Sequence, residues 1–167
     1  WVLTEALLDA NALQPKATVI EMSSGGMYNA PLTLAYMGIK NPKKYSGVYA
    51  YAVHKRGQAE LVKYWHARHA AKGMRFYVMH PGWADTDGVK TAMPNFRKIL
   101  KSVLRDSAQG ADTALWLAAT RPSAPGPEAF WFDRAPRPAH AYPQTQQTKD
   151  TPDGLAAFLA REAAQVA

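Results

Sequence analysis

The stretch Ala17-Thr-Val-Ile-Glu-Met-Ser-Ser-Gly-Gly26 indicates the fold class of this chain. Residues 17–22 are mostly apolar and partly β-branched, so they predict a short strand, and the serines and glycines that follow predict its end. Segments 75–79 and 129–132 have the same strand-like character. Helical patterns alternate with these strands, at 2–10, 48–72, 106–120 and from 154 onward. This alternation predicts an α/β fold in which about three strands form a parallel sheet with flanking helices.

Composition is typical of one globular domain. The chain has 167 residues, of which 47% are apolar, and it contains no cysteine. We therefore expect a single domain over 1–167, with a Pro-rich tail and a C-terminal helix at 135–167. The lack of cysteine excludes a disulfide framework and thiolate chemistry, and it agrees with a cytoplasmic location. No apolar run approaches the roughly 20 residues that a membrane-crossing helix needs, so we expect no membrane partner.

The basic charge does not by itself predict a nucleic-acid partner. The formal net charge is +7, but the basic residues are dispersed along the chain. The densest stretches, 40–44 and 97–105, carry no aromatic residues interleaved in the manner of nucleic-acid sites. We expect no nucleic-acid partner, and a basic surface would equally suit an anionic dinucleotide.

The strongest chemical motif is Tyr51-Ala-Val-His-Lys55, at the start of the long helical pattern. A spacing of four places the phenol and the ammonium on one helix face, one turn apart. The pKa of a free tyrosine is about 10, and a nearby cation favours the phenolate, which brings proton exchange closer to neutral pH. We therefore assign Tyr51 as the acid/base and Lys55 as the residue that tunes it.

A second copy of this motif, Tyr36-Met-Gly-Ile-Lys40, has to be weighed against the first. It contains Gly38, and Pro42 follows shortly after it, so a helix could hardly continue through it. Its tyrosine and lysine then need not share a face. Tyr51 opens a long run of good helix formers, and we favour it for this reason.

Polar residues follow two of the predicted strands. Ser23-Ser24 come after 17–22, and His80-Pro-Gly-Trp-Ala-Asp-Thr86 comes after 75–79. Ligands of open parallel sheets bind at the carboxyl ends of the strands, where a serine hydroxyl could hydrogen-bond a carbonyl oxygen. Each segment alone is equally a strand-ending turn. These two segments become informative together with Tyr51-x-x-x-Lys55, because the three motifs occur in a particular order along the chain.

Serines after a strand, Tyr-x-x-x-Lys on a helix and Pro-Gly-x-x-x-Thr after the next strand resemble, in that order, the short-chain dehydrogenase/reductase superfamily. Finer matches resemble its branch named dehydrogenase/reductase family member twelve; they lie at 23–28, 50–56, 80–86, 109–113 and 132–134. The resemblance implies that Ser24 orients a substrate carbonyl, Tyr51 transfers the proton, and Lys55 holds the nicotinamide ribose. The cofactor-binding residues that it implies are Tyr51, Lys55, Pro81, Gly82, Trp83 and Thr86.

The resemblance also implies a function and a fold larger than this chain. The function is NAD- or NADP-dependent interconversion of a small-molecule carbonyl and an alcohol. The fold is the C-terminal part of a Rossmann-like doubly wound parallel sheet, because no Gly-x-x-x-Gly-x-Gly turn occurs here and Trp1 falls inside an amphipathic pattern. We expect the natural chain to extend upstream, with the N-terminal half missing here and this fragment inactive alone. A homo-oligomer is compatible with the resemblance, since many relatives pair through the long helix.

Three other interpretations of the sequence are possible. A non-enzymatic remnant or interaction module is the alternative if nothing precedes Trp1. A serine hydrolase is disfavoured because Met22 stands where its Gly-x-Ser-x-Gly turn would require glycine. A metal site is not assigned, because His66-x-x-His69 has no third ligand at helical spacing.

Overall fold

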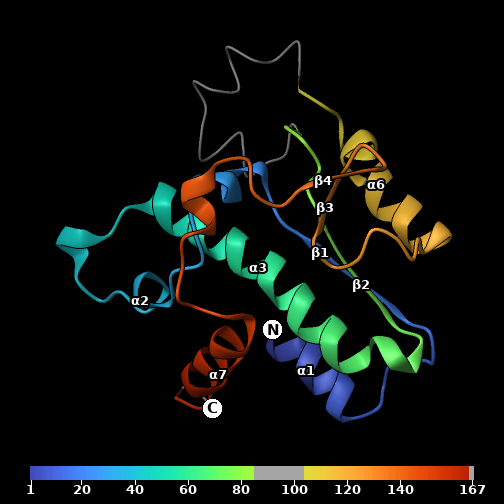
Figure 1. The fold of residues 1–167 in the computed structure, drawn as a ribbon, viewed down its shortest axis with the longest axis horizontal. Coiled ribbons are helices and arrows are strands. Elements are labelled where there is room, and N and C mark those ends of the chain that lie inside the picture. Colours follow the sequence, from blue (N-terminus) through green and yellow to red (C-terminus); the bar gives the residue numbers. More distant parts are fainter. Residues whose placement is uncertain (85–103, 166–167) are drawn as a thin grey trace.

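In the computed structural model of the chain, residues 1–84 and 104–165 are described. Helices and strands alternate along them, as the hydrophobic pattern predicts. Four elements are strands and the others are α- or 3-10 helices (Figure 1): α1 Val2–Asp9, β1 Thr18–Met22, η1 Gly25–Asn29, α2 Leu34–Met37, η2 Pro42–Lys44, α3 Gly47–His69, η3 Ala70–Lys72, β2 Arg75–Met79, α6 Ser107–Thr120, β3 Ala129–Phe132, β4 Ala135–Pro138, η4 Pro143–Gln146 and α7 Pro152–Ala163. Within these ranges, no helix is long and apolar enough to cross a membrane.

The strands form one sheet in the order β1-β2-β3-β4. β1 and β2 run parallel, with Thr18 opposite Arg75 and Met22 opposite Met79, and β3 continues the parallel part beside β2. The prediction of an α/β fold with a parallel, Rossmann-like sheet is therefore confirmed. Because β1 and β2 end in register, the residues that follow them meet at one edge of the sheet.

The fourth strand was not predicted. β4 pairs antiparallel with β3, and Asp133 and Arg134 form the turn between them with φ angles of 51° and 56°. Two consecutive residues in the left-handed region are what a tight hairpin turn requires. β4 contains Pro136 and Pro138, and prolines argue against a strand unless it lies at an edge, as β4 does. The first four residues of the predicted Pro-rich tail thus belong to the sheet.

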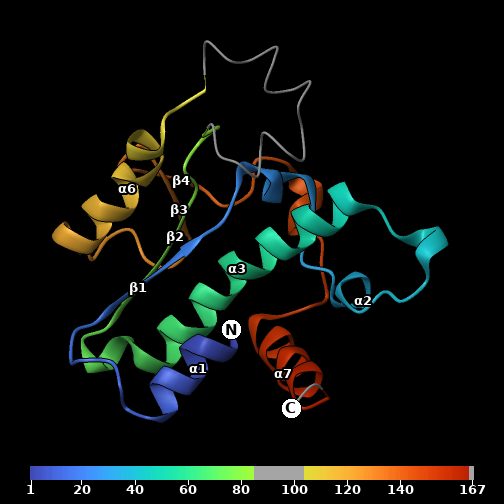
Figure 2. The ribbon, with the colours of Figure 1, turned by 180° about the vertical axis from the view of Figure 1, so that it is seen from behind.

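Helices cover both faces of the sheet. α1, α3 and α7 lie on one side and α6 lies on the other, in both views of the ribbon (Figure 1, Figure 2). Side chains of β2 alternate between the two layers, because successive residues of a strand point to opposite faces. Phe76 belongs to a cluster with Trp65 of α3, and Tyr77 to a cluster with Leu117 of α6. β2 is consequently buried on both faces, as expected for a central parallel strand.

The long helix begins and ends close to the predicted positions. The side chain of Ser46 caps its first turn by accepting from the backbone N–H of Tyr49. Its last residues tighten into the 3-10 turn η3, and Gly73 stops it with a φ of 78°. Between β1 and α3 the structure has three short helices, η1, α2 and η2. It is this segment that carries the serines.

Candidate functional site

The predicted site residues gather at the carboxyl edge of the sheet. The backbone N–H of Ser23 donates to the carbonyl of Met79 at 2.7 Å, and that of His80 donates to Trp131 at 3.1 Å. These bonds extend the parallel pairing one residue beyond the strand ends. The serine loop, the turn after β2 and the end of β3 therefore lie beside one another, where ligands of such folds bind.

The two adjacent serines have different roles in the structure. Ser23 is 3% exposed, and its hydroxyl donates to the backbone carbonyl of Lys55 at 2.7 Å. Ser24 is half-buried, and its Oγ accepts from the backbone N–H of Gly26 at 3.1 Å. A hydroxyl that accepts at one lone pair still has its own hydrogen to donate. Ser24 therefore keeps a donor for a ligand, whereas Ser23 ties the strand end to α3.

Tyr51 lies against the serine loop at Gly26. An added Cβ at Gly26 would come within 3.0 Å of Tyr51 Cε1 and 3.5 Å of Ser24 Oγ. The missing side chain of this glycine is thus what lets the phenol ring approach the loop so closely. Tyr51 is 50% exposed, so its ring is open to a ligand. The sequence motif did not reveal the role of Gly26, because a glycine after two serines is equally a simple turn residue.

Lys55 reaches the same edge from the next turn of α3. Its Nζ donates to the carbonyl of Met22 at 3.0 Å and lies 5.8 Å from the centre of the Tyr51 ring. Partial burial lowers the pKa of Lys55, and the negative charge of Glu21 opposes this effect. Glu21, in β1, accepts a hydrogen bond from the side chain of Gln58 at 2.8 Å, so its carboxylate has a polar partner on α3. Nothing in the sequence pattern indicated this use of Glu21.

The second Tyr-x-x-x-Lys copy occupies a different setting. α2 ends at Met37, one residue after Tyr36, as the nearby glycine and proline predicted. The Tyr36 hydroxyl accepts from the backbone N–H of Ser46 at 2.6 Å, and Lys40 is exposed. Tyr36 therefore shapes the chain just before α3.

The turn after β2 is held in an unusual backbone conformation. Gly82 has a φ of 77°, and its N–H donates to Nδ1 of His80 at 3.1 Å. A Cβ at Gly82 would lie 2.8 Å from Nε of Arg105, so the arginine side chain packs directly over this glycine. Pro81 is half-buried and Trp83 is 60% exposed beside it. The remaining residue predicted to line the nicotinamide, Thr86, lies outside the described residues.

His80 supports this turn through aromatic stacking, which the sequence did not predict. Its ring stacks on Phe132 with centroids 4.2 Å apart and an interplanar angle of 8°, and on Phe130 at 5.1 Å and 18°. Burial chiefly, and the charge of Arg105 next, lower the pKa of His80 from 6.5 to about 4, against the opposing charge of Asp133. The imidazole is thus neutral at physiological pH, and Nδ1 is the acceptor for Gly82.

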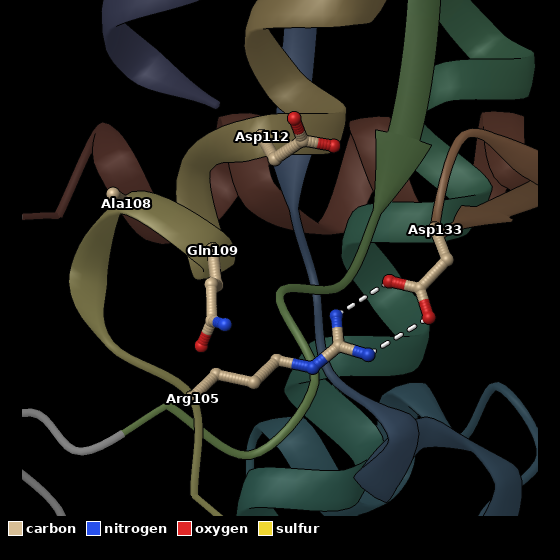
Figure 3. Close-up of a pocket in the computed structure, with 5 residues that line it drawn as sticks. All are labelled: Arg105, Ala108, Gln109, Asp112 and Asp133. Carbon is tan, nitrogen blue, oxygen red and sulfur yellow. Dashed lines mark hydrogen bonds and ion pairs between the residues drawn. The ribbon is translucent and has the colours of Figure 1, made fainter.

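A hollow of about 480 Å³ opens beside the turn, between α6 and the β3–β4 hairpin. Figure 3 shows Arg105 reaching across it to Asp133, with two hydrogen bonds of 2.5 and 2.8 Å. The guanidinium also lies over the Phe132 ring, 4.7 Å from its centre. Asp112, on the wall of the hollow, pairs with Arg134. The charged residues that line the hollow are therefore already paired with one another or with Arg134. A ligand in the hollow would be recognised mainly by its shape and by polar contacts, and less by unpaired charges.

Comparison with known proteins supports the resemblance drawn from the motifs. No family model matches the chain. The chain is 39% identical to dehydrogenase/reductase SDR family member 12 of Bos taurus, over 84% of this chain and 44% of that relative. It is 40% identical to the protein of the same name from Homo sapiens, with the same coverage. The chain thus spans less than half the length of these relatives.

Motif order, sheet topology and sequence similarity lead to one family. The superfamily and the branch that the motifs predicted are those of the curated relatives. The α/β architecture described above agrees with them. Over most of its own length, the chain is accordingly similar to family member 12 of the short-chain dehydrogenase/reductases, an oxidoreductase-type family.

Proposed function

We propose that this chain carries the catalytic residues of an NAD(P)-dependent oxidoreductase that interconverts a carbonyl and an alcohol. The observation that carries the proposal is the meeting of three side chains at one edge of the sheet. Ser24 and Tyr51 both lie against Gly26, and Lys55 stands one helical turn behind Tyr51.

Tyr51 is the group that moves the proton. Its half-exposed phenol can reach a substrate oxygen, and the ammonium of Lys55 lies 5.8 Å from the centre of its ring. The phenol therefore gives its proton to a developing alkoxide in reduction and accepts it back in oxidation. General acid–base catalysis of this kind contributes about 10²- to 10⁴-fold to a rate.

Ser24 orients the substrate oxygen. Its Oγ accepts from Gly26 N–H, which fixes the side chain and directs its own hydrogen away from the loop backbone. A carbonyl oxygen placed between this hydrogen and the Tyr51 phenol would receive two hydrogen bonds. Donors that are held in place before reaction stabilise the negative charge that develops on such an oxygen.

The residues at this edge suit the nicotinamide end of a dinucleotide. Lys55 uses one of its three N–H donors on Met22, which leaves donors for ribose hydroxyls. Pro81, Gly82 and Trp83 would lie against the ring. A bound nicotinamide supplies or takes the hydride in such reactions. The chain contains no Gly-x-x-x-Gly-x-Gly turn, so these contacts concern the nicotinamide end alone.

The proposal is tested on the complete protein with NADH and NADPH and a panel of ketones and aldehydes. Tyr51→Phe should lower kcat by about 10²-fold or more, since it removes the transferable proton. Tyr45→Phe is the matched control, because Tyr45 is an exposed tyrosine of the same segment, and it should leave kcat unchanged. Tyr36→Phe tests the second motif copy.

Two outcomes contradict the proposal. Full activity in Tyr51→Phe with activity lost in Tyr36→Phe would move the acid/base role to the other copy. A complete protein that neither binds a nicotinamide cofactor nor turns over any carbonyl would favour the non-enzymatic alternative.

A further inference from the structure

Arg56 is the residue after Lys55, and its side chain is completely buried, with 0% of its surface exposed. A buried cation is costly unless hydrogen bonds compensate it. Among the described residues, its hydrogen-bond partners are all backbone carbonyls and none is a carboxylate. The negative charge of Glu60 also favours this buried cation, and the three carbonyls indicate what the side chain holds in place.

Two of the three carbonyls belong to the serine loop. Nη2 of Arg56 donates to Met27 at 3.2 Å, and Nε donates to Ala30 at 3.2 Å. These residues lie within and just after η1, the short helix that Ser24 caps. The planar guanidinium presents its donors in a fixed fork, so it defines the position of two carbonyls relative to α3 at once.

Lys55 and Ser23 hold the other end of the same segment. The Lys55 ammonium donates to Met22 at 3.0 Å, and the Ser23 hydroxyl donates to the Lys55 carbonyl at 2.7 Å. Two consecutive residues of α3, Lys55 and Arg56, thus form hydrogen bonds to the chain before and after Ser24. The segment 22–30 is fastened to the helix that carries Tyr51 at both of its ends.

The third carbonyl joins the segment after β4 to this arrangement. Nη1 of Arg56 donates to Ala139 at 2.8 Å, and the hydroxyl of Tyr28 donates to Pro138 at 2.8 Å. The serine loop is therefore held between α3 on one side and residues 138–139 on the other. Apolar side chains at position 56 could fill the space but could not supply these directional bonds.

From this geometry we propose that Arg56 is a positioning residue, which fixes the distance between Ser24 and Tyr51. Ser24 and Tyr51 lie on different elements, and both approach Gly26. The directional bonds that hold the loop to α3 come from Lys55, Ser23 and Arg56. The effect on turnover rests on the proposed function, whereas the effect on the loop does not.

The test compares Arg56→Lys with Arg68→Lys in the complete protein. Lysine keeps the charge but lacks the fork, and Arg68 is an arginine of the same helix whose partners, Tyr64 and Asp153, lie away from the site. Hydrogen exchange of amides 25–30 and 139–141 should become about 10-fold faster in Arg56→Lys. Exchange in β2 and α7 should be unchanged, and kcat should fall about 10- to 100-fold with little change in the KM for the cofactor.

The measurements separate this inference from the function on which it partly rests. Unchanged exchange at amides 25–30, or equally faster exchange throughout the chain with a lowered Tm, would overturn the positioning role. Local loosening without any loss of kcat would overturn its relevance to catalysis. A wild-type protein without turnover would instead overturn the proposed function, and the exchange result would still decide whether Arg56 holds the loop. Arg68→Lys should match wild type in every readout.

Discussion

Acid should destabilise the fold through His80. The imidazole is stacked on Phe130 and Phe132 and accepts a hydrogen bond from Gly82 at Nδ1. Burial first, and then the charge of Arg105, lower its pKa from 6.5 to about 4. Protonation would place a desolvated charge on the ring and replace the Gly82 acceptor with a second donor. The unfolded chain carries no such penalty.

The sign and size of the effect follow from linkage. His80 has the lower pKa in the folded state, so the unfolded chain binds the proton first as the pH falls. The contribution to stability is complete above pH 6.5 and is lost progressively down to about pH 4. Over that interval the full effect is about 3 kcal/mol, and because the ring is not completely shielded from solvent we expect about 2 kcal/mol.

Urea unfolding between pH 4.5 and pH 7, on wild type and His80→Asn, measures this contribution. Asparagine retains an acceptor near Nδ1 but does not titrate. The pKa values of His69 and His140 are also lowered by burial, so the wild-type slope alone would mix three residues. Asp112 and Asp133 have pKa values held below 3.8 by hydrogen bonds from their arginine partners, so they matter only at lower pH. The difference between the two proteins therefore isolates His80.

The reasoning fails if His80→Asn and wild type lose the same free energy of unfolding between pH 7 and pH 4.5. It fails equally if wild type becomes more stable towards acid over this range. A variant that is less stable at pH 7 but has a flatter pH profile is the expected result, because the stacking contacts with Phe130 and Phe132 are lost at every pH.

Three further substitutions have defined expected results. Gly26→Ala should lower kcat with little change in Tm, since the new Cβ would press on the half-exposed Tyr51 ring at 3.0 Å, and preserved activity would argue against close packing there. Gly82→Ala should cost about 2 kcal/mol in urea unfolding, because a φ of 77° is strained for alanine and its Cβ would displace Arg105; a cost near zero would contradict this geometry. Asp106→Ala should cost about 1 kcal/mol, because Asp106 accepts from the Gln109 N–H in the capping box of α6, and Asp106→Asn should restore most of it.

Local patterns were sufficient to predict the three parallel strands and the long helix. Each is encoded by neighbouring residues. The strands are apolar runs that end at serine, proline or glycine, and the helix is a long run, mostly of helix formers, that Gly73 stops. The spacing of Tyr51 and Lys55 is likewise a local property of one helix. The preference for Tyr51 over Tyr36 followed from the same kind of signal, since α2 ends one residue after Tyr36.

The sequence by itself therefore determined the α/β class, the order of the elements and the motif residues, while tertiary structure decided what surrounds them. Arg56 meets carbonyls 26 and 83 residues away in the chain, and no periodicity reports such a pairing. The stacking of His80 on Phe130 and Phe132, and the approach of Tyr51 to Gly26, also join segments that are distant in sequence. β4 was missed because its prolines disfavour a strand and only its place at the edge of the sheet permits one. Secondary structure arises from short-range sterics and hydrogen bonding, whereas the geometry of a site depends on which long-range contacts the packed sheet and helices bring within reach.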